Sequence, residues 1–316
     1  TAGGAMTVGN YNTVLGRSAL SSSVDGAHNT AIGYNALQDY EGGANEGNNT
    51  AVGSKSQLNA TTGTSNTSIG TIAFGTGVLT GVGNVAVGYA TGNQMTAGTK
   101  NTLLGASAGE SLTIGNNNVA VGYESLGLSV DGDANTAVGY QSLKNYEDGD
   151  GNGHNTAVGS KSQLNATTGE FNTSLGSLSM GVGVTTGDYN VAIGNEAGYD
   201  LTSGTRNTFV GYRSGYEATT DTSNTGVGYN SLKSSKTSTN NVAIGDSALE
   251  ANVDGDANVA VGYLALRVFE PANGATYNTA VGYSAGVAMT TGTYNTIMGG
   301  LAGDALTTGA SNVALG

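Results

Sequence analysis

The sequence contains no cysteine and no tryptophan, a single proline, and few charged residues. Without cysteine, the chain can form neither a disulfide nor a thiolate metal site. Charged residues make up 10% of the 316 residues, and 23 Asp and Glu against 10 Lys and Arg give a formal net charge of −13. This charge repels phosphate backbones, so we expect no nucleic acid partner and no binding to anionic membrane surfaces. No apolar run reaches the roughly 18 residues of a membrane-spanning helix, so we also expect no membrane span.

Glycine, in contrast, is abundant, with 54 residues, and much of it belongs to one short motif. The motif is a pentapeptide of Asn, Thr or Val, a variable residue, an aliphatic residue and Gly, as in Asn155–Gly159 (NTAVG), and it occurs eighteen times. Successive motif asparagines are 17 to 20 residues apart. The glycines lack the every-third spacing of collagen. A short unit at a nearly fixed period predicts a solenoid, in which each repeat stacks on its neighbours.

A longer module is superimposed on the short repeat. The segment Asn49–Gly63 recurs letter for letter at Asn155–Gly169, 106 residues further on. We therefore expect one repeat array over residues 1–316, with modules at approximately 12–117, 118–240 (with one extra coil) and 241–316 (incomplete). Because the chain begins at Thr1 without methionine and within a repeat, we expect it to be a fragment of a longer fibre.

Each repeat predicts two short strands and two turns. Thr-Ala-Val alternates with the period of two that is typical of a strand. We expect the Thr or Val and the aliphatic residue to face the interior, and the Ala between them to face outward. Glycine permits a positive-φ turn, and asparagine tolerates the left-handed region and can bond to neighbouring backbone. The residues predicted to form these internal rows include Asn12, Asn29, Asn49, Asn135, Asn155 and Asn258, Gly16, Gly33, Gly53, Gly139, Gly159 and Gly262, and Leu15, Ile32, Val52, Val138, Val158 and Val261.

The predicted fold is therefore an all-β, parallel β-roll or β-solenoid of about 18 coils of about 17 residues each. Stacked at a sheet spacing of roughly 4.8 Å, these coils would form a rod on the order of 85 Å long. Each coil offers few apolar side chains against the entropy of ordering its backbone. We therefore expect a further face, made by the Ala/Ser-Leu segment and the outward strand position, to be buried in an oligomer.

The repeat resembles the head repeats of trimeric autotransporter adhesins, whose motif is Asn-Ser-Val-Ala-Ile-Gly, and more closely the NTAVGYxAL arrays of phage tail-fibre-like proteins. Asn135–Leu143 (NTAVGYQSL), Asn29–Leu37 (NTAIGYNAL) and Asn278–Gly286 (NTAVGYSAG) carry the resemblance. It implies a left-handed β-roll with three intertwined or packed chains per fibre, presented outside a cell, on its surface or on a virion. The repeats are longer than those of the adhesins, and no coiled-coil stalk or membrane anchor is visible.

The three 20-residue coils carry the candidate receptor loops, because recognition residues are often on loops held by a rigid scaffold. Each has an aromatic residue followed by glutamate: Tyr40 and Glu41, Tyr146 and Glu147, and Phe269 and Glu270. Such loops could bind a cell-surface or glycan receptor. The alternative is a tolerated insertion whose aromatic ring folds back onto the roll.

Candidate calcium ligands lie in acidic turns. Asp148, Asp150 and Asn152 match the first half of a calcium-loop pattern, but the glutamate that should complete it is missing. Asp131 with Asp133, and Asp254 with Asp256, are shorter carboxylate pairs. Solvated polar turns are the alternative, and we expect no other cofactor.

We expect no catalytic residue. Two Gly-x-Ser-x-Gly matches, at Gly105–Gly109 and Gly282–Gly286, lack the following helix that this motif needs. A row of tyrosines after the motif glycine could be a glycan platform, or could simply cover a sheet.

The sequence thus favours a structural or adhesive segment of an extracellular or virion fibre, such as an adhesin head or tail-fibre shaft. Two alternatives stay open: a filament subunit that stacks end to end, and a calcium-dependent surface-binding module.

Overall fold

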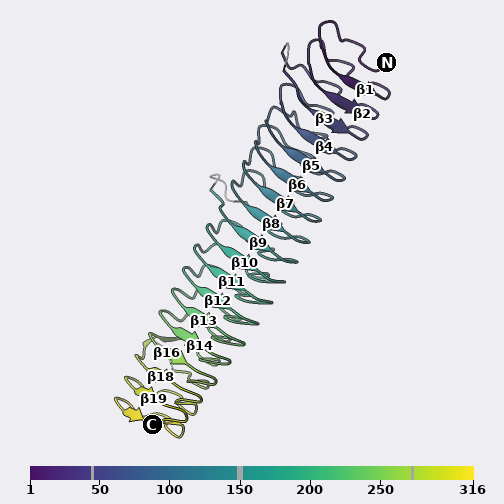
Figure 1. Ribbon diagram of the computed structural model, residues 1–316. Helices are drawn as coiled ribbons and strands as arrows, with labels where there is room; N and C mark the ends of the chain where they lie inside the picture. The colour runs from purple at the N-terminus through teal and green to yellow at the C-terminus, as the bar shows by residue number, and fades with distance from the viewer. Residues whose placement is uncertain (44–45, 148–151, 272–273) are drawn as a thin grey trace. The chain divides into compact units, whose positions relative to one another are not determined.

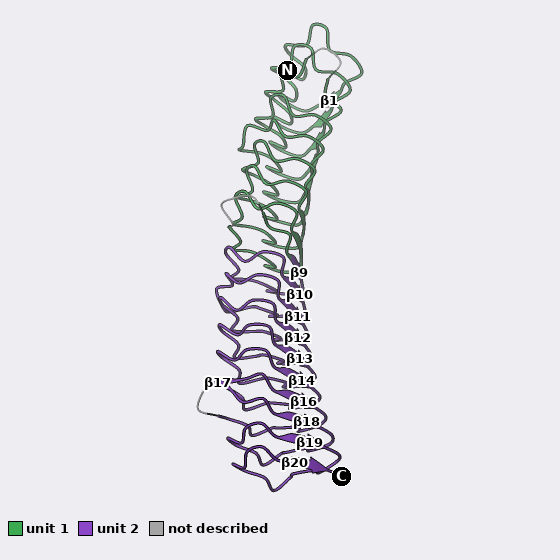
Figure 2. Cartoon of the chain, turned by 90° about the vertical axis from the view of Figure 1, so that its left-hand side faces the viewer, with its two compact units in different colours: residues 1–155 green, residues 156–316 purple. Residues whose placement is uncertain are grey.

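The computed structural model describes residues 1–43, 46–147, 152–271 and 274–316. The chain is a parallel β-solenoid with about 17 residues per turn and about 18 coils, as predicted, and each coil contains one three-residue strand rather than the two short strands expected. The described residues include no helix, and therefore none that could cross a membrane. The chain divides into two compact units, residues 1–155 and 156–316 (Figure 2), and this division falls inside the second predicted module.

Unit 1 contains eight strands of three residues. They are β1 (Thr13–Leu15), β2 (Thr30–Ile32), β3 (Thr50–Val52), β4 (Thr67–Ile69), β5 (Val85–Val87), β6 (Thr102–Leu104), β7 (Val119–Val121) and β8 (Thr136–Val138). Each of β1 to β7 pairs in parallel with the strand one coil further along, so that equivalent residues lie side by side, as Val14 does with Ala31. Figure 1 shows these strands lying one above another.

Unit 2 repeats this arrangement with ten such strands. They are β9 (Thr156–Val158), β10 (Thr173–Leu175), β11 (Val191–Ile193), β12 (Thr208–Val210), β13 (Thr225–Val227), β14 (Val242–Ile244), β16 (Val259–Val261), β18 (Thr279–Val281), β19 (Thr296–Met298) and β20 (Val313–Leu315). Each pairs in parallel with the strand that follows it in this series, up to β20, which pairs with β19. A second, two-stranded sheet joins β15 (Gly255–Asp256) to β17 (Gly274–Ala275).

The strands alternate as predicted, but with the opposite sense, so the predicted inward row was wrong. In β2 to β14, β16, β18 and β19, the middle residue is buried. Ala31 and Ala157 are 0% exposed, whereas Leu15 is 66% exposed. The other predicted core aliphatics are only partly buried: Ile32, Val52, Val138, Val158 and Val261.

The reason for the reversal is the narrowness of the coil. At Gly226, the middle residue of β13, an added Cβ would lie 2.7 Å from Ser214 Oγ and 3.3 Å from the Phe209 ring. Most middle strand positions are therefore Ala, Ser or Gly. The bulk of the core comes from the segment after the motif glycine, where Leu37 and Leu249 are 0% exposed.

That segment was predicted to be a second strand with an outward Ala/Ser-Leu pair, and both expectations were wrong. Ala36 and Leu37 are fully buried. Asn35 and Leu37 have φ of 54° and 50°, in the left-handed region, which no β-strand can use. The segment is a tight turn whose N–H groups bond to neighbouring coils, as Leu37 N–H does to Ser56 C=O at 2.9 Å.

Candidate functional site

The motif asparagines form a buried ladder that holds neighbouring coils together, as predicted. In unit 2, Asn241 Oδ1 accepts the backbone N–H of Asn258 at 2.9 Å and its side-chain amide at 3.2 Å. The Nδ2 of Asn241 donates to Gly255 C=O, fourteen residues later in its own coil, at 2.8 Å. The same pattern occurs in unit 1, where Asn84 bonds to Asn66 and to Gly98. These side chains therefore bond both to a neighbouring coil and within their own coil, whereas the Nδ2 groups of Asn29 and Asn135, in two of the 20-residue coils, are buried without a partner among the described residues.

The motif glycines lie where coils approach most closely. Gly228 has a φ of +137°, and a Cβ there would lie 2.4 Å from Gly245 C=O on the next coil. Gly16, Gly33, Gly53, Gly159 and Gly262 are equally close to the next coil, with a backbone oxygen 2.3 to 2.5 Å from an added Cβ. Both the dihedral angle and the contact exclude a side chain, so the glycine is needed for stacking.

The outward positions of the strands form an uncharged apolar surface on each unit, which we call the strand face. It consists of the first and third residues of each three-residue strand, all of which are Thr, Val, Ile, Leu or Met. In unit 1 Ile69 is 44% exposed, and in unit 2 Leu175 and Met298 are 48% and 47% exposed. The sequence contained this pattern, but the expectation that larger aliphatic residues face inward concealed it.

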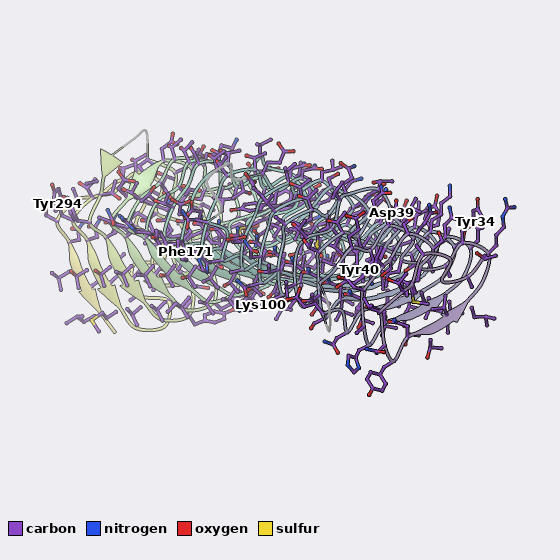
Figure 3. All side chains as sticks on the ribbon, turned by 90° about the horizontal axis from the view of Figure 1, so that it is seen from above. Tyr34, Asp39, Tyr40, Lys100, Phe171 and Tyr294 are labelled. Atoms are coloured by element: carbon purple, nitrogen blue, oxygen red, sulfur yellow. The ribbon has the colours of Figure 1, made fainter. Side chains whose placement is uncertain are left out.

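Aromatic side chains precede the motif asparagine or follow the motif glycine on either side of the strand. Before the asparagine, Phe171 stacks on Tyr189 with ring centroids 5.2 Å apart, and Tyr277 stacks on Tyr294 at 5.4 Å. After the glycine, the pairs include Tyr123 with Tyr140, Tyr212 with Tyr229, and Tyr263 with Tyr283. Tyr34, 44% exposed, and Tyr294, 59% exposed, project from the ribbon in Figure 3. Many of the exposed tyrosines therefore lie on the surface in stacked pairs, and the glycan role of the tyrosine row stays a prediction.

The aromatic residues of the candidate receptor loops belong to the core. Tyr40, Tyr146 and Phe269 are 0% exposed, so these rings cannot contact a receptor while the coil is folded. Each is eleven residues after its motif asparagine, where other coils bury smaller core residues such as Ala60 and Leu112. Counting from the asparagine would have identified this position as interior. Glu41, Glu147 and Glu270 are exposed, as a receptor contact requires.

The shorter acidic turns carry hydrogen bonds between coils. Asp133 Oδ1 accepts the backbone N–H of Asn116, and Asp256 Oδ1 accepts that of Thr239 at 2.6 Å. Asp254 Oδ1 accepts the Thr237 hydroxyl. Asp131, in the same turn as Asp133, is half-buried, and Asn152 C=O accepts the Tyr146 hydroxyl at 2.9 Å. Asp148 and Asp150 lie outside the described residues. Among the side chains that the structure describes, no group of three or more His, Asp or Glu could hold a metal ion.

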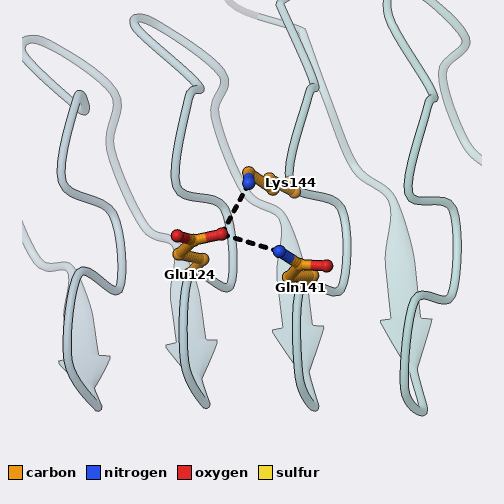
Figure 4. A network of polar contacts seen from close by, with 3 residues as sticks. All are labelled: Glu124, Gln141 and Lys144. Atoms are coloured by element: carbon orange, nitrogen blue, oxygen red, sulfur yellow. Dashed lines mark hydrogen bonds and ion pairs between the residues drawn. The ribbon is translucent and has the colours of Figure 1, made fainter.

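A polar network on unit 1 shows how surface charges connect coils (Figure 4). Glu124 Oε2 accepts hydrogen bonds from Lys144 Nζ at 2.5 Å and from Gln141 Nε2 at 2.8 Å. The hydrogen bond from Lys144, followed by that from Gln141, lowers the pKa of Glu124 to about 2. Unit 2 has similar pairs between adjacent coils, Arg213 with Glu196 and Arg267 with Glu250. These contacts connect adjacent coils.

The fold thus places the chain among parallel β-solenoids. No protein-family model matches the chain, and no curated protein matches it at a significant level of sequence similarity.

Proposed function

We propose that this chain is a structural segment of an extracellular or virion fibre, and that its copies associate with each other through the strand face. The observation that carries the proposal is the exposed aliphatic row, in which Leu175, Ile244 and Met298 of unit 2 are each more than 40% exposed. Contiguous exposed apolar surface on a protein commonly marks an interaction site. The resemblance of the repeats to fibre proteins supports the location and a threefold assembly.

The charge distribution favours a second copy as the occupant. Copies with a net charge of −13 repel one another. The strand face carries no charged residue, so approach through it costs the least electrostatic energy. An identical copy also has the same strand spacing, so its rows of side chains can interdigitate with this row along a whole unit.

The strand face of one unit is about as large as one side of a standard protein interface. Ten strands of unit 2 at roughly 4.8 Å spacing, with flanking residues giving a width of about 16 Å, present on the order of 750 Å². A standard protein interface buries about 800 Å² on each partner. The strand face of one unit is therefore large enough for a stable contact.

The test is the mass of the particle in solution, measured by analytical ultracentrifugation. We expect the natural sequence to sediment as a multiple of the 31.2 kDa chain. The triple variant Leu175→Lys, Ile244→Lys and Met298→Lys should sediment as a single chain, because the added charges would be buried at the interface. Val182→Lys, Val184→Lys and Val268→Lys together form the matched control, since these residues are similarly exposed but lie outside the strands.

A single-chain mass for the natural sequence, or an assembled strand-face variant, would contradict association through this face. Electron microscopy of the same samples separates discrete particles from continuous fibres. Continuous fibres that survive the strand-face substitutions would instead support end-to-end stacking.

A further inference from the structure

Unit 2 contains one acidic side chain in its interior. Three residues before the motif asparagine, most coils of this unit have glycine, at Gly169, Gly187, Gly204, Gly255, Gly292 and Gly309. The coil of residues 207–223 has Asp221 at this corner instead, and it is 0% exposed. A buried carboxyl group in a position that most coils leave without a side chain requires an explanation, because burying a charge is costly.

The buried carboxyl group is only half satisfied. Asp221 Oδ1 accepts the Ser235 hydroxyl at 2.9 Å, and Ser235 Oγ lies 2.5 Å from Ser238 Oγ on the same coil. Asp221 Oδ2 is buried without a hydrogen-bond partner. Among the described residues, Asp221 takes part in no ion pair. The site therefore accommodates a neutral carboxylic acid more readily than a carboxylate.

The charged groups around Asp221 do not compensate a negative charge. Arg206 on the preceding coil is exposed, and Lys236 on the following coil pairs with Glu217, with 3.4 Å between Nζ and Oε2. Asp254, one coil further, has the same charge as an ionised Asp221. Burial first, and to a lesser degree Asp254, raises the pKa of Asp221 to about 7, although Ser235 and Ser238 act against this.

The corner is connected directly to the asparagine ladder. Asp221 C=O accepts the Nδ2 of Asn207 at 2.7 Å and the N–H of Thr205 at 3.1 Å. Asn224, the next motif asparagine, donates to Ser238 C=O at 2.8 Å. Movement of the Asp221 side chain into solvent would displace its own carbonyl, and with it the bond to Asn207.

We propose that Asp221 is a proton-operated latch: the corner of residues 218–224 stays closed while this carboxyl group carries a proton, and it opens locally when the carboxyl group ionises. The two states are the packed corner and a corner whose carboxylate is hydrated. The effect belongs to unit 2 and does not depend on association between copies.

The chain has no cysteine, so a single introduced thiol can report on this corner. Ala218→Cys places it at a residue of the same corner that is 0% exposed. Its labelling rate is measured from pH 5 to pH 9 with Asp221 and again with Asp221→Asn, which keeps the shape but cannot ionise. The ratio of the two rates cancels the intrinsic effect of pH on the thiol.

We expect the ratio to rise by up to tenfold per pH unit from pH 5 towards pH 7 and to level off above about pH 7, where the carboxyl group is ionised in the closed corner as well. Asp221→Gly, which restores the residue of most other coils, should label with the same pH dependence as Asp221→Asn and covers the case in which Asp221→Asn does not fold. A ratio that is constant over the whole pH range would overturn the latch. So would a rise that millimolar Na⁺ or Ca²⁺ abolishes at pH 8, because a cation and not a proton would then close the corner.

Discussion

At the scale of the residue, two side-chain requirements at each coil act together. Asparagine supplies an acceptor for the next coil and a donor across its own, while glycine allows the backbone of the next coil to approach to within contact distance. The two roles are separable by substitution, because one depends on hydrogen bonds and the other on space and dihedral angle.

Asn241→Ala should lower the free energy of unfolding by about 3 kcal/mol, because it removes a buried acceptor that serves two groups of Asn258. Urea denaturation measures the loss. Asn195→Ala is the control, since Asn195 is exposed and makes a single bond to Ser177 C=O. Equal effects of the two substitutions would show that the ladder contributes no more than a surface amide.

Gly228→Ala should destabilise unit 2 by about 3 kcal/mol or more, because it combines a left-handed backbone with a contact of 2.4 Å. Gly300→Ala should have almost no effect, since a Cβ there meets no atom within 4 Å. The melting temperatures of the two variants, measured by thermal unfolding, test this difference. A tolerated Gly228→Ala would mean that the coils can separate at this turn without cost.

At the scale of the element, the 20-residue coils use their aromatic residue to fill the corner. Tyr40 is 0% exposed, and burial, followed by the charge of Glu46, raises its pKa to about 12. Tyr40→Ala should therefore cost about 3 to 5 kcal/mol by leaving a cavity. Tyr34→Ala, at an exposed ring, should cost less than about 1 kcal/mol. Chemical denaturation gives the free energy of unfolding of both variants. If Tyr40→Ala left this free energy unchanged, Tyr40 would again be a candidate receptor contact.

The Glu124 network should make unit 1 sensitive to acid. The folded pKa of Glu124 is lowered to about 2, so its contribution to stability is present above the unfolded value of about 4.5 and is lost as the pH falls towards 2. Because both Glu124 and Lys144 are 23% exposed, the contribution should stay below about 1 kcal/mol. Asp221 acts in the opposite direction, since its raised pKa removes stability as the pH rises towards 7.

The unfolding midpoint of Glu124→Gln, followed between pH 2 and pH 6, checks this sign. The variant should lose the part of the acid dependence that the natural sequence shows in this range. Glu41→Gln, at an exposed carboxylate, serves as the control and should leave the profile unchanged. A larger acid loss in Glu124→Gln than in the natural sequence would contradict the assignment.

At the scale of the whole molecule, the repeat predicted the fold class, the coil length, the asparagine ladder and the glycine turns. These follow from spacing and backbone chemistry, which one sequence displays fully. Periodicity also showed that Ala243 and Ile244 face opposite ways, but it could not say which faces inward. That depends on the space inside the coil, where a Cβ at Gly226 would already lie 2.7 Å from Ser214 Oγ.

The candidate site was harder to predict for the same reason. Tyr146 and Phe269 are in sequence segments that look like loop insertions, and only their register with Ala166 or Leu201 shows that they are core. The sequence shows that Asp221 occupies a position where most coils have glycine. The burial of the Asp221 side chain, however, depends on how tightly neighbouring corners stack. Distance along the chain does not report that packing.

The most direct test of the account is the reactivity of single thiols at neighbouring positions of β14. Ala243→Cys should resist labelling at every protein concentration, because residue 243 is 0% exposed. Ile244→Cys should react quickly in dilute solution, since Ile244 is 41% exposed, and should become protected as the concentration rises and copies cover the strand face. If Ala243→Cys reacts faster than Ile244→Cys, the interior has been assigned to the wrong side of the strand; if Ile244→Cys stays reactive at high concentration, copies do not meet at this face.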